Sequence, residues 1–215
     1  MIILDSVWKS IPSQSDAYVL RDCSYTFDVE RIYAIQGVSG VGKTTLLRLI
    51  NNLASVDQGQ ILLGGQDISK LHPSEVRQRI SLLSQTPAFV GETVESNLQF
   101  AQRFARREEA DFKELLAQVH LDASLLDRQV TDLSVGQQQR VCLARTLVTQ
   151  PEVLLLDEPT SALDDATAER ILSLVREISM TEKLLTIFVT HRRSHARKLG
   201  QVLLELRDLT LKEAT

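Results

Sequence analysis

The sequence predicts an α/β fold with a mostly parallel sheet, and two observations carry that prediction. Runs typical of strands alternate along the chain with segments whose apolar residues recur at helical spacing. Two of the strand-like runs, 153–156 and 185–189, are continuous rather than alternating, which is typical of strands buried on both faces of a parallel sheet. Strands and helices that alternate in this way favour an α/β architecture.

The predicted elements follow one another from the amino terminus. Strands are expected at 1–8, 18–27, 31–36, 60–63, 80–83, 153–157, 184–190 and 201–206. One helix is expected at 43–53, directly behind a glycine-rich segment. A second is expected at 166–180, where Ile171, Leu174 and Ile178 repeat at helical spacing.

The stretch from about 93 to 150 differs from the rest because it shows helical patterns and no convincing strand. Phe112, Leu115, Leu116 and Val119 form one amphipathic face there. A chain of 215 residues fits one large domain, or one domain with a small insert. We therefore expect a single domain over 1–215, with a helical subdomain at about 93–150 inserted in the α/β core.

Composition and charge exclude several classes of function. Hydrophobic residues make up 43% of the chain, which is enough for a sizeable core. A formal net charge of −4 gives no basic footprint, so a nucleic-acid partner is not expected. Two cysteines are too few for a disulfide scaffold or a zinc site. The start is no signal peptide and no apolar run could span a bilayer, so we expect a cytoplasmic protein that reaches a membrane only through a partner.

Residues 37–44, GVSGVGKT, match the phosphate-binding pattern G-x-x-x-x-G-K-[ST] completely. A chance glycine turn is the alternative, but a predicted strand precedes the match and a predicted helix follows it. The glycines let backbone N–H groups face phosphate oxygens at a helix N-terminus. Lys43 would reach the β and γ phosphates of ATP, and the Thr44 hydroxyl would bind Mg²⁺. The candidate nucleotide-binding residues of this segment are Gly37, Ser39, Gly40, Gly42, Lys43, Thr44 and Thr45.

The second half of a nucleotide site is expected at 153–158, VLLLDE. Asp157 ends a buried strand, where a carboxylate needs a cation partner, and Mg²⁺ is that partner. Glu158 is one residue further and could take a proton from the water that attacks the γ phosphate. An apolar strand that ends in Asp-Glu is a weak pattern alone, but here it follows a matched phosphate loop.

Four further motifs resemble those of the ATP-binding subunits of ABC transporters. Residues 133–140, LSVGQQQR, resemble the family signature, commonly LSGGQ, and Ser134 precedes Asp157 by 23 residues, as in the family. Gln85 corresponds to the family's Q-loop, 161–164 (SALD) to its D-loop and His191 to its switch histidine. The motifs occur in family order over 37–191, and flanking strands extend the resemblance to essentially the whole chain. The implied fold is a P-loop NTPase of ABC type with an N-terminal antiparallel β part.

The resemblance implies an ATPase that works as a head-to-tail pair. Ser134, Gly136 and Gln137 of a second subunit, on a helix starting near Gln137, would close the site over the γ phosphate, and Asp164 would communicate across the pair. The implied catalytic residues are Glu158, His191 and Gln85, with His191 touching the γ phosphate and orienting Glu158. The implied Mg²⁺ ligands are Thr44, Gln85 and Asp157, and Gln85 would pass the state of the metal and the water to the helical insert.

The resemblance also implies a separate membrane permease, docked near Gln85 and the helical insert, and a location on the inner face of the cell membrane. The segment 86–98 is similar to that of exporter-type ATPases, most of all a bacterial iron-export family, and import of a small solute remains open. A soluble ABC ATPase that acts in assembly or regulation is the alternative. A kinase or GTPase would leave the signature, the D-loop and the switch histidine together unexplained.

The sequence departs from the family pattern at two places. Val135 stands where the signature has its first glycine, and its branched side chain could alter packing against the nucleotide. The family's adenine-stacking aromatic is replaced by Ile11 in the usual frame, with Trp8 and Tyr18 nearby. Any of these three residues could contact adenine.

Overall fold

The computed structural model describes residues 1–11, 14–105 and 110–214, and it contains two β-sheets. The first is antiparallel, in the order β2–β1–β4–β5, and consists of β1 (Ile2–Ile11), β2 (Gln14–Phe27), β4 (Gln58–Leu63) and β5 (Gln66–Asp67). The second has the order β10–β9–β3–β8–β7–β6 and consists of β3 (Ile32–Gln36), β6 (Ile80–Leu83), β7 (Val153–Asp157), β8 (Leu185–Thr190), β9 (Val202–Arg207) and β10 (Thr210–Glu213). All neighbouring strands of the second sheet are parallel except β10, which pairs antiparallel with β9.

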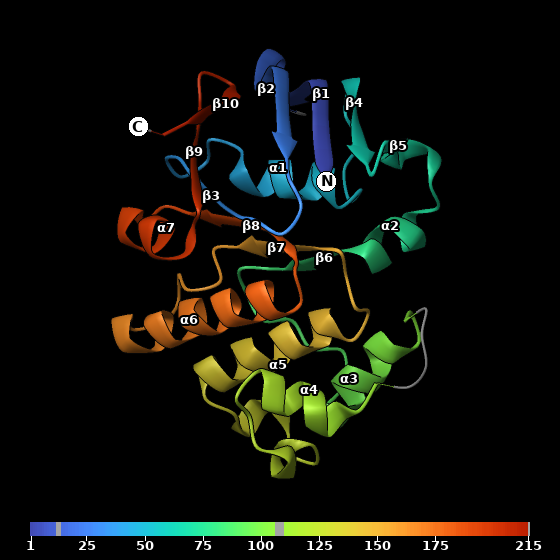
Figure 1. Cartoon of the computed structure of the whole chain (residues 1–215), viewed down its shortest axis with the longest axis vertical. Coiled ribbons are helices and arrows are strands. Elements are labelled where there is room, and N and C mark those ends of the chain that lie inside the picture. Colours follow the sequence, from blue (N-terminus) through green and yellow to red (C-terminus); the bar gives the residue numbers. More distant parts are fainter. Residues whose placement is uncertain (12–13, 106–109, 215) are drawn as a thin grey trace.

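This architecture confirms the predicted fold class. Every residue of β7 and β8 is buried, as their continuously apolar runs predict for strands covered on both faces. Figure 1 shows the antiparallel sheet and α1 (Lys43–Ile50) on one side of the parallel sheet. The other side is covered by α5 (Val135–Leu147) and α6 (Asp165–Thr181).

The remaining helices have nine residues or fewer. They are α2 (Pro73–Arg79), α3 (Val94–Gln102), α4 (Phe112–Gln118) and α7 (Arg193–Leu199), together with single 3₁₀ turns at Ile68–Lys70, Ala123–Leu125 and Val130–Asp132. Between 93 and 150 the structure places α3, α4 and α5, which gather at the end of the molecule opposite the antiparallel sheet (Figure 1).

Two predicted helix boundaries were wrong. The helix predicted at 43–53 ends at Ile50, since Asn51 caps it and Asn52 has a left-handed φ of 55°. The helix expected to start near Gln137 starts at Val135, because Ser134 is its N-cap. Ser134 and Gln137 form a capping box, in which each side chain accepts a hydrogen bond from the backbone N–H of the other.

Two apolar clusters fill the space on either side of the parallel sheet. Alternate residues of a strand point to opposite faces, so Leu154 and Phe188 pack toward α5 and α6, whereas Leu155 and Ile187 pack toward α1 and the antiparallel sheet. Both cysteines, Cys23 and Cys142, are buried and free, and burial raises the pKa of each thiol. Among the described residues no helix is both long and apolar enough to cross a membrane.

Candidate active site

The phosphate-binding segment connects β3 to α1 at the carboxyl end of the parallel sheet. Gly40 and Gly42 have left-handed φ values of 78° and 112°, which only glycine adopts at little cost. A Cβ on Gly42 would also lie 2.1 Å from Cγ1 of Val19 on β2. The loop curls around the buried ammonium of Lys43, which donates to the carbonyl oxygens of Gly37 (2.9 Å) and Val38 (3.1 Å). The sequence therefore produces the cradle that its motif predicts.

Thr44 and Asp157 meet where α1 begins and β7 ends. The Thr44 hydroxyl donates to Oδ1 of Asp157 at 3.0 Å, and Asp157 is only 6% exposed. Burial raises the pKa of this carboxyl, while the hydrogen bond from Thr44 opposes that shift. A hydroxyl and a buried carboxylate are oxygen ligands of the kind that Mg²⁺ prefers, so the residues present fit this ion.

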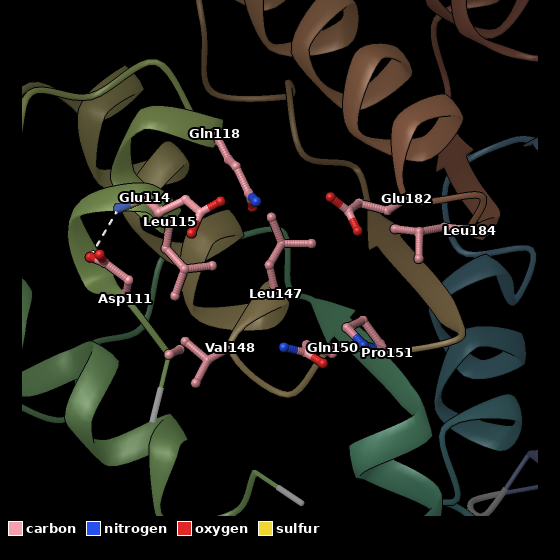
Figure 2. A pocket seen from close by; sticks show the side chains of 11 residues that line it. Asp111, Glu114, Leu115, Gln118, Leu147, Val148, Gln150, Pro151, Glu182 and Leu184 are labelled. Carbon is pink, nitrogen blue, oxygen red and sulfur yellow. Dashed lines mark hydrogen bonds between the residues drawn. The ribbon is translucent and has the colours of Figure 1, made fainter. Parts of the chain in front are cut away.

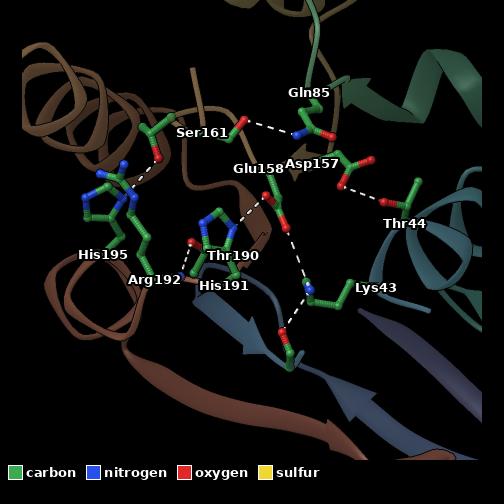
Figure 3. A network of polar contacts seen from close by, with 12 residues as sticks. Lys43, Thr44, Gln85, Asp157, Glu158, Ser161, Thr190, His191, Arg192 and His195 are labelled. Carbon is green, nitrogen blue, oxygen red and sulfur yellow. Dashed lines mark hydrogen bonds and ion pairs between the residues drawn. The ribbon is translucent and has the colours of Figure 1, made fainter. Parts of the chain in front are cut away.

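Figure 3 shows the Glu158 carboxylate between the side chains of His191 and Lys43. Its Oε2 lies 2.8 Å from Nδ1 of His191, and its Oε1 lies 3.7 Å from Nζ of Lys43. The backbone of Glu158 has a left-handed φ of 46°, and its N–H donates to the carbonyl of Val189 at 3.1 Å. A left-handed φ costs a non-glycine residue about 1–3 kcal/mol. Nine other non-glycine residues of the described chain share it, so this backbone conformation does not by itself mark the site.

Gln85 follows β6 by two residues and reaches the same edge of the sheet. Its Nε2 donates to the hydroxyl of Ser161 at 3.2 Å (Figure 3). Ser161 belongs to the turn that follows Glu158, where the buried Thr160 hydroxyl lies 3.0 Å from Nδ1 of His195. Lys43, Thr44, Gln85, Asp157, Glu158 and His191 are thus brought together at one place, as the sequence predicts.

The signature residues form a separate cluster at the start of α5. Gly136 is buried against Thr167, and Thr167 donates its N–H to the carboxylate of Asp164, the N-cap of α6, at 3.0 Å. This hydrogen bond and a second one from the Thr167 side chain hold the pKa of Asp164 below its usual range. A cavity of about 330 Å³ lies between the start of α5 and the segment 162–167. The side chain of Val135 is 50% exposed beside it.

The three candidates for adenine contact lie on β1 and β2. Trp8 packs edge-on against Tyr18, with ring centres 5.5 Å apart, and the guanidinium of Arg21 lies 5.3 Å from the centre of the Trp8 ring. Trp8 and Tyr18 are therefore already engaged with protein neighbours, and Ile11 is half-buried at the end of β1.

Three residues of this region, Val19, Thr160 and His195, were missed by the sequence analysis, and Ser161 was predicted only as the first residue of the D-loop. Val19 stands beside the phosphate loop, Ser161 accepts from Gln85, and Thr160 and His195 meet in the interior. The only signal in the sequence for Thr160 and His195 is their position. Thr160 comes two residues after Glu158, and His195 comes four residues after His191.

A second cavity, of about 340 Å³, lies at the opposite edge of the sheet (Figure 2). Its lining includes Pro151 and Leu184, which stand before β7 and β8, and the acidic side chains of Glu114 and Glu182. None of the predicted site residues lines it. In sheets of this kind ligands bind outside the carboxyl ends of the strands, so the site is at the other edge.

The fold and the clustered residues together define a P-loop ATPase. A family model described as ABC transporter matches residues 20–161, and the chain belongs to this family of ATP-binding, ATP-hydrolysing transporter subunits. The matched residues include the phosphate loop at 37–44, Gln85, the signature segment at 133–140 and the strand that ends in Asp157 and Glu158.

Named relatives include proteins of both transport directions. The chain is 35% identical to the probable iron export ATP-binding protein FetA of Escherichia coli over 85% of this chain and 84% of that protein. It is 36% identical to the methionine import ATP-binding protein MetN of Cereibacter sphaeroides over 93% of this chain and 59% of that protein.

Solved structures agree with this assignment. A bacterial ABC transporter cassette solved as a dimer has a TM-score of 0.86 and 26% identity, and the match covers 100% of this chain and 98% of that one. The same cassette in a dimeric post-hydrolysis state bound to ADP and Pi has a TM-score of 0.87, with the same identity and coverage.

Proposed function

We propose that this chain hydrolyses ATP as one of a pair of identical subunits and so drives solute movement through a separate membrane permease. The observation that carries the proposal is the position of Glu158, held by His191 and beside Lys43 at the end of β7, next to the Thr44–Asp157 pair. The Glu158 carboxylate is thus oriented for proton transfer, while the Asp157 carboxylate, which accepts from Thr44, would bind a cation. The chain would act as one unit, with a helical subdomain at about 93–150.

The hydrolysis step follows from these positions. Gly37, Gly40, Gly42 and Lys43 bind the phosphates, and Ser39 and Thr45 lie on the same loop and helix start. Glu158 accepts a proton from the water whose oxygen bonds to the γ phosphorus, while the bond to the bridging oxygen of ADP breaks. The hydrogen bond from His191 fixes the direction of the Glu158 carboxylate. Mg²⁺, held by Thr44, Asp157 and Gln85, would neutralise charge on the phosphate oxygens.

A second copy would complete the site. In one chain the start of α5, with Ser134, Gly136 and Gln137, lies beside the D-loop residues that line the same cavity. The two dimeric structures similar to this chain support a head-to-tail pair. In such a pair the N-terminus of α5 from one subunit would face the phosphate loop of the other, where its dipole favours negative charge.

Two exposed apolar side chains in the chain between Gln85 and residue 105 are consistent with a permease partner. Val90, on the segment after Gln85, is exposed, as is Phe104 just after α3, where it packs edge-on against Phe100. A protein partner that buried these side chains would gain free energy by removing them from water. A permease that covered them would place the chain on the inner face of the membrane. The similarity of 86–98 to exporters and the relative FetA support metal export, and MetN makes import the competing direction.

Glu158→Gln tests the catalytic assignment. The variant should bind ATP normally but hydrolyse it at least about 100-fold more slowly, since general-base catalysis contributes on that order. Phosphate release and size-exclusion chromatography with Mg-ATP would measure the loss and the expected ATP-bound pair. Glu177→Gln, on the outer face of α6, is the matched control. A normal turnover rate in Glu158→Gln would contradict the assignment of Glu158 as the base.

Recovery of partners from solubilised membranes tests the transport role. Tagged Glu158→Gln with Mg-ATP should retain a stoichiometric polytopic membrane protein, whose own sequence would then narrow the solute and the direction. Soluble partners alone, recovered with an intact ATP-bound pair, would instead assign the chain to the ABC ATPases that act in assembly or regulation.

A further inference from the structure

The turn from Glu158 to Ser161 is held by three side-chain contacts that come from outside it. Glu158 contacts His191 at 2.8 Å, Thr160 contacts His195 at 3.0 Å, and Ser161 accepts from Gln85 at 3.2 Å. Two of the three partners belong to the single segment formed by the end of β8 and the short helix α7. The position of the Glu158 carboxylate therefore depends on how this segment is fastened to the turn.

The His195–Thr160 contact is the buried member of the three. His195 is 7% exposed and Thr160 is 2% exposed, whereas His191 and Gln85 face solvent. A buried hydroxyl without a partner costs more than a hydrogen bond contributes, so the two side chains hold each other in place. The other two contacts are accessible to water and are more easily exchanged for hydrogen bonds to solvent.

The surroundings of His195 favour the neutral form of its imidazole. Burial, reinforced by the charges of Arg192 and His191, lowers the pKa of His195 below 6.5, and the carboxylates of Asp165 and Glu169 only partly oppose this. Those carboxylates pair with Arg192 at 2.9 Å and with Lys198 at 2.8 Å. A neutral imidazole can accept from the Thr160 hydroxyl or donate to it, which suits a structural hydrogen bond.

We propose that His195 is a positioning residue for hydrolysis: through Thr160 it fastens α7 to the turn that carries Glu158, and so sets the direction of the catalytic carboxylate. The inference rests on the proposed role of Glu158 as the base. The inference gives the two histidines of this segment different roles. His191 contacts the carboxylate itself, and His195 fixes the backbone from which the carboxylate extends.

Thr160→Val and Thr160→Ser form the matched pair that tests this inference. Valine keeps the volume of threonine and removes the hydroxyl, whereas serine keeps the hydroxyl. Thr160→Val should lower kcat about tenfold with KM for ATP within about twofold, because a small misplacement of a catalytic group affects the chemical step more than binding. Thr160→Ser should retain most of the activity of the unmodified chain.

His195→Leu and the double variant His195→Leu/Thr160→Val complete a mutant cycle. His195→Leu alone should also lower kcat about tenfold, and the double variant should be no slower than either single one, since both remove the same contact. The double variant also leaves no buried hydroxyl unpaired, so it keeps the test open where a single variant fails to fold. Thermal melts of all four variants verify folding.

The outcomes separate this inference from the proposed function. Unchanged kcat in folded Thr160→Val, or losses that multiply in the double variant, would overturn the role of His195 while Glu158→Gln stays inactive. A raised KM with unchanged kcat would also overturn it, because the pair would then serve ATP binding. Normal turnover in Glu158→Gln would instead remove the proposed function on which the inference depends.

Discussion

In the proposed pair, the phosphate loop and the signature segment form two half-sites with different constructions. In the first, Gly40, Gly42 and Glu158 have left-handed backbone conformations, and the Lys43 ammonium donates hydrogen bonds to two carbonyl groups of its own loop. The second is a regular helix start, in which Ser134 and Gln137 cap α5 with ordinary geometry. A loop that wraps a phosphate needs the left-handed positions of Gly40 and Gly42, whereas a surface that only closes over the phosphate needs the N-terminus of a regular helix.

The difference shows how the work of one chain is divided. The half that contains the phosphate loop also contains Glu158, the proposed base, together with Lys43 and the residues suited to Mg²⁺. The half that contains the signature segment offers backbone N–H groups and the Ser134 hydroxyl. In the fold of the same chain it lies beside the D-loop residues that line the same cavity. Changes in the first half should therefore affect ATP binding or chemistry within one subunit, and changes in the second half should affect only the pair.

Lys43→Ala should give the largest effect of the changes that sharpen this comparison. A charge-assisted contact to phosphate is worth about 1.5–3 kcal/mol, so the Kd of a single subunit for ATP should rise roughly 10- to 100-fold. Titration with a fluorescent ATP analogue at low protein concentration measures this. Lys70→Ala, an exposed lysine in the turn that follows β5, is the control. Unchanged affinity in Lys43→Ala would break the distinction between the two halves.

Ser134→Ala should have a smaller and more selective effect. ATP binding by the single subunit should be unchanged, while the ATP-dependent pair in the Glu158→Gln background should weaken roughly fivefold, because it would lose one hydrogen bond worth about 1 kcal/mol. Asp111→Ala, which removes the N-cap of α4, controls for general loss of helix stability. Equal weakening of the pair in both variants would show that the signature serine acts only on its own helix. Analytical ultracentrifugation would measure the pair.

The smallest expected effect is a change in stability at Asp57. This residue contacts β1 of the antiparallel sheet, which lies outside both half-sites. Asp57 accepts hydrogen bonds from Nζ of Lys9 (2.7 Å) and from the N–H and hydroxyl of Ser10 (2.6 Å each), which lower its pKa to about 2. Since the pKa in the folded chain is below that of the unfolded chain, this stabilisation is complete above about pH 4 and is lost as the pH falls toward 2.

Asp57→Asn should therefore destabilise the chain by about 1 kcal/mol at neutral pH, a figure reduced for the solvent exposure of the pair. The same variant should lose less stability than the unmodified chain when the pH is lowered from 4 to 2. Urea unfolding at a series of pH values measures both. Parallel acid curves for the two proteins would show that the carboxylate is not linked to folding.

The sequence was most informative where the chain is most apolar. The strands predicted at 80–83 and 153–157 have the observed bounds of β6 and β7, because buried parallel strands are unbroken apolar runs. The helices α2 and α7 were missed. Seven residues long, α2 buries Val76 alone, and α7 has the mostly polar sequence RSHARKL, so neither shows an apolar period. The short strands β5 and β10 were missed for the same reason.

For the candidate site, too, the sequence predicted local patterns better than contacts that depend on long-range packing. Sequence spacing predicted which residues lie together, because motifs at the ends of parallel strands meet at one edge of the sheet. It could not identify the left-handed backbone of Glu158 or the His195–Thr160 contact. Both arise from how β8 and α7 pack against the turn, and no local pattern encodes that packing.

The burial of both cysteines makes this chain a convenient subject for thiol labelling. Cys23 and Cys142 lie in the two separate cores and have raised pKa values, so neither offers a reactive thiolate at neutral pH. A single cysteine placed at Val38 or at Val135, both exposed, would react alone with a maleimide dye. Opening and closing of a pair could then be followed by fluorescence in the otherwise native sequence, turnover by turnover.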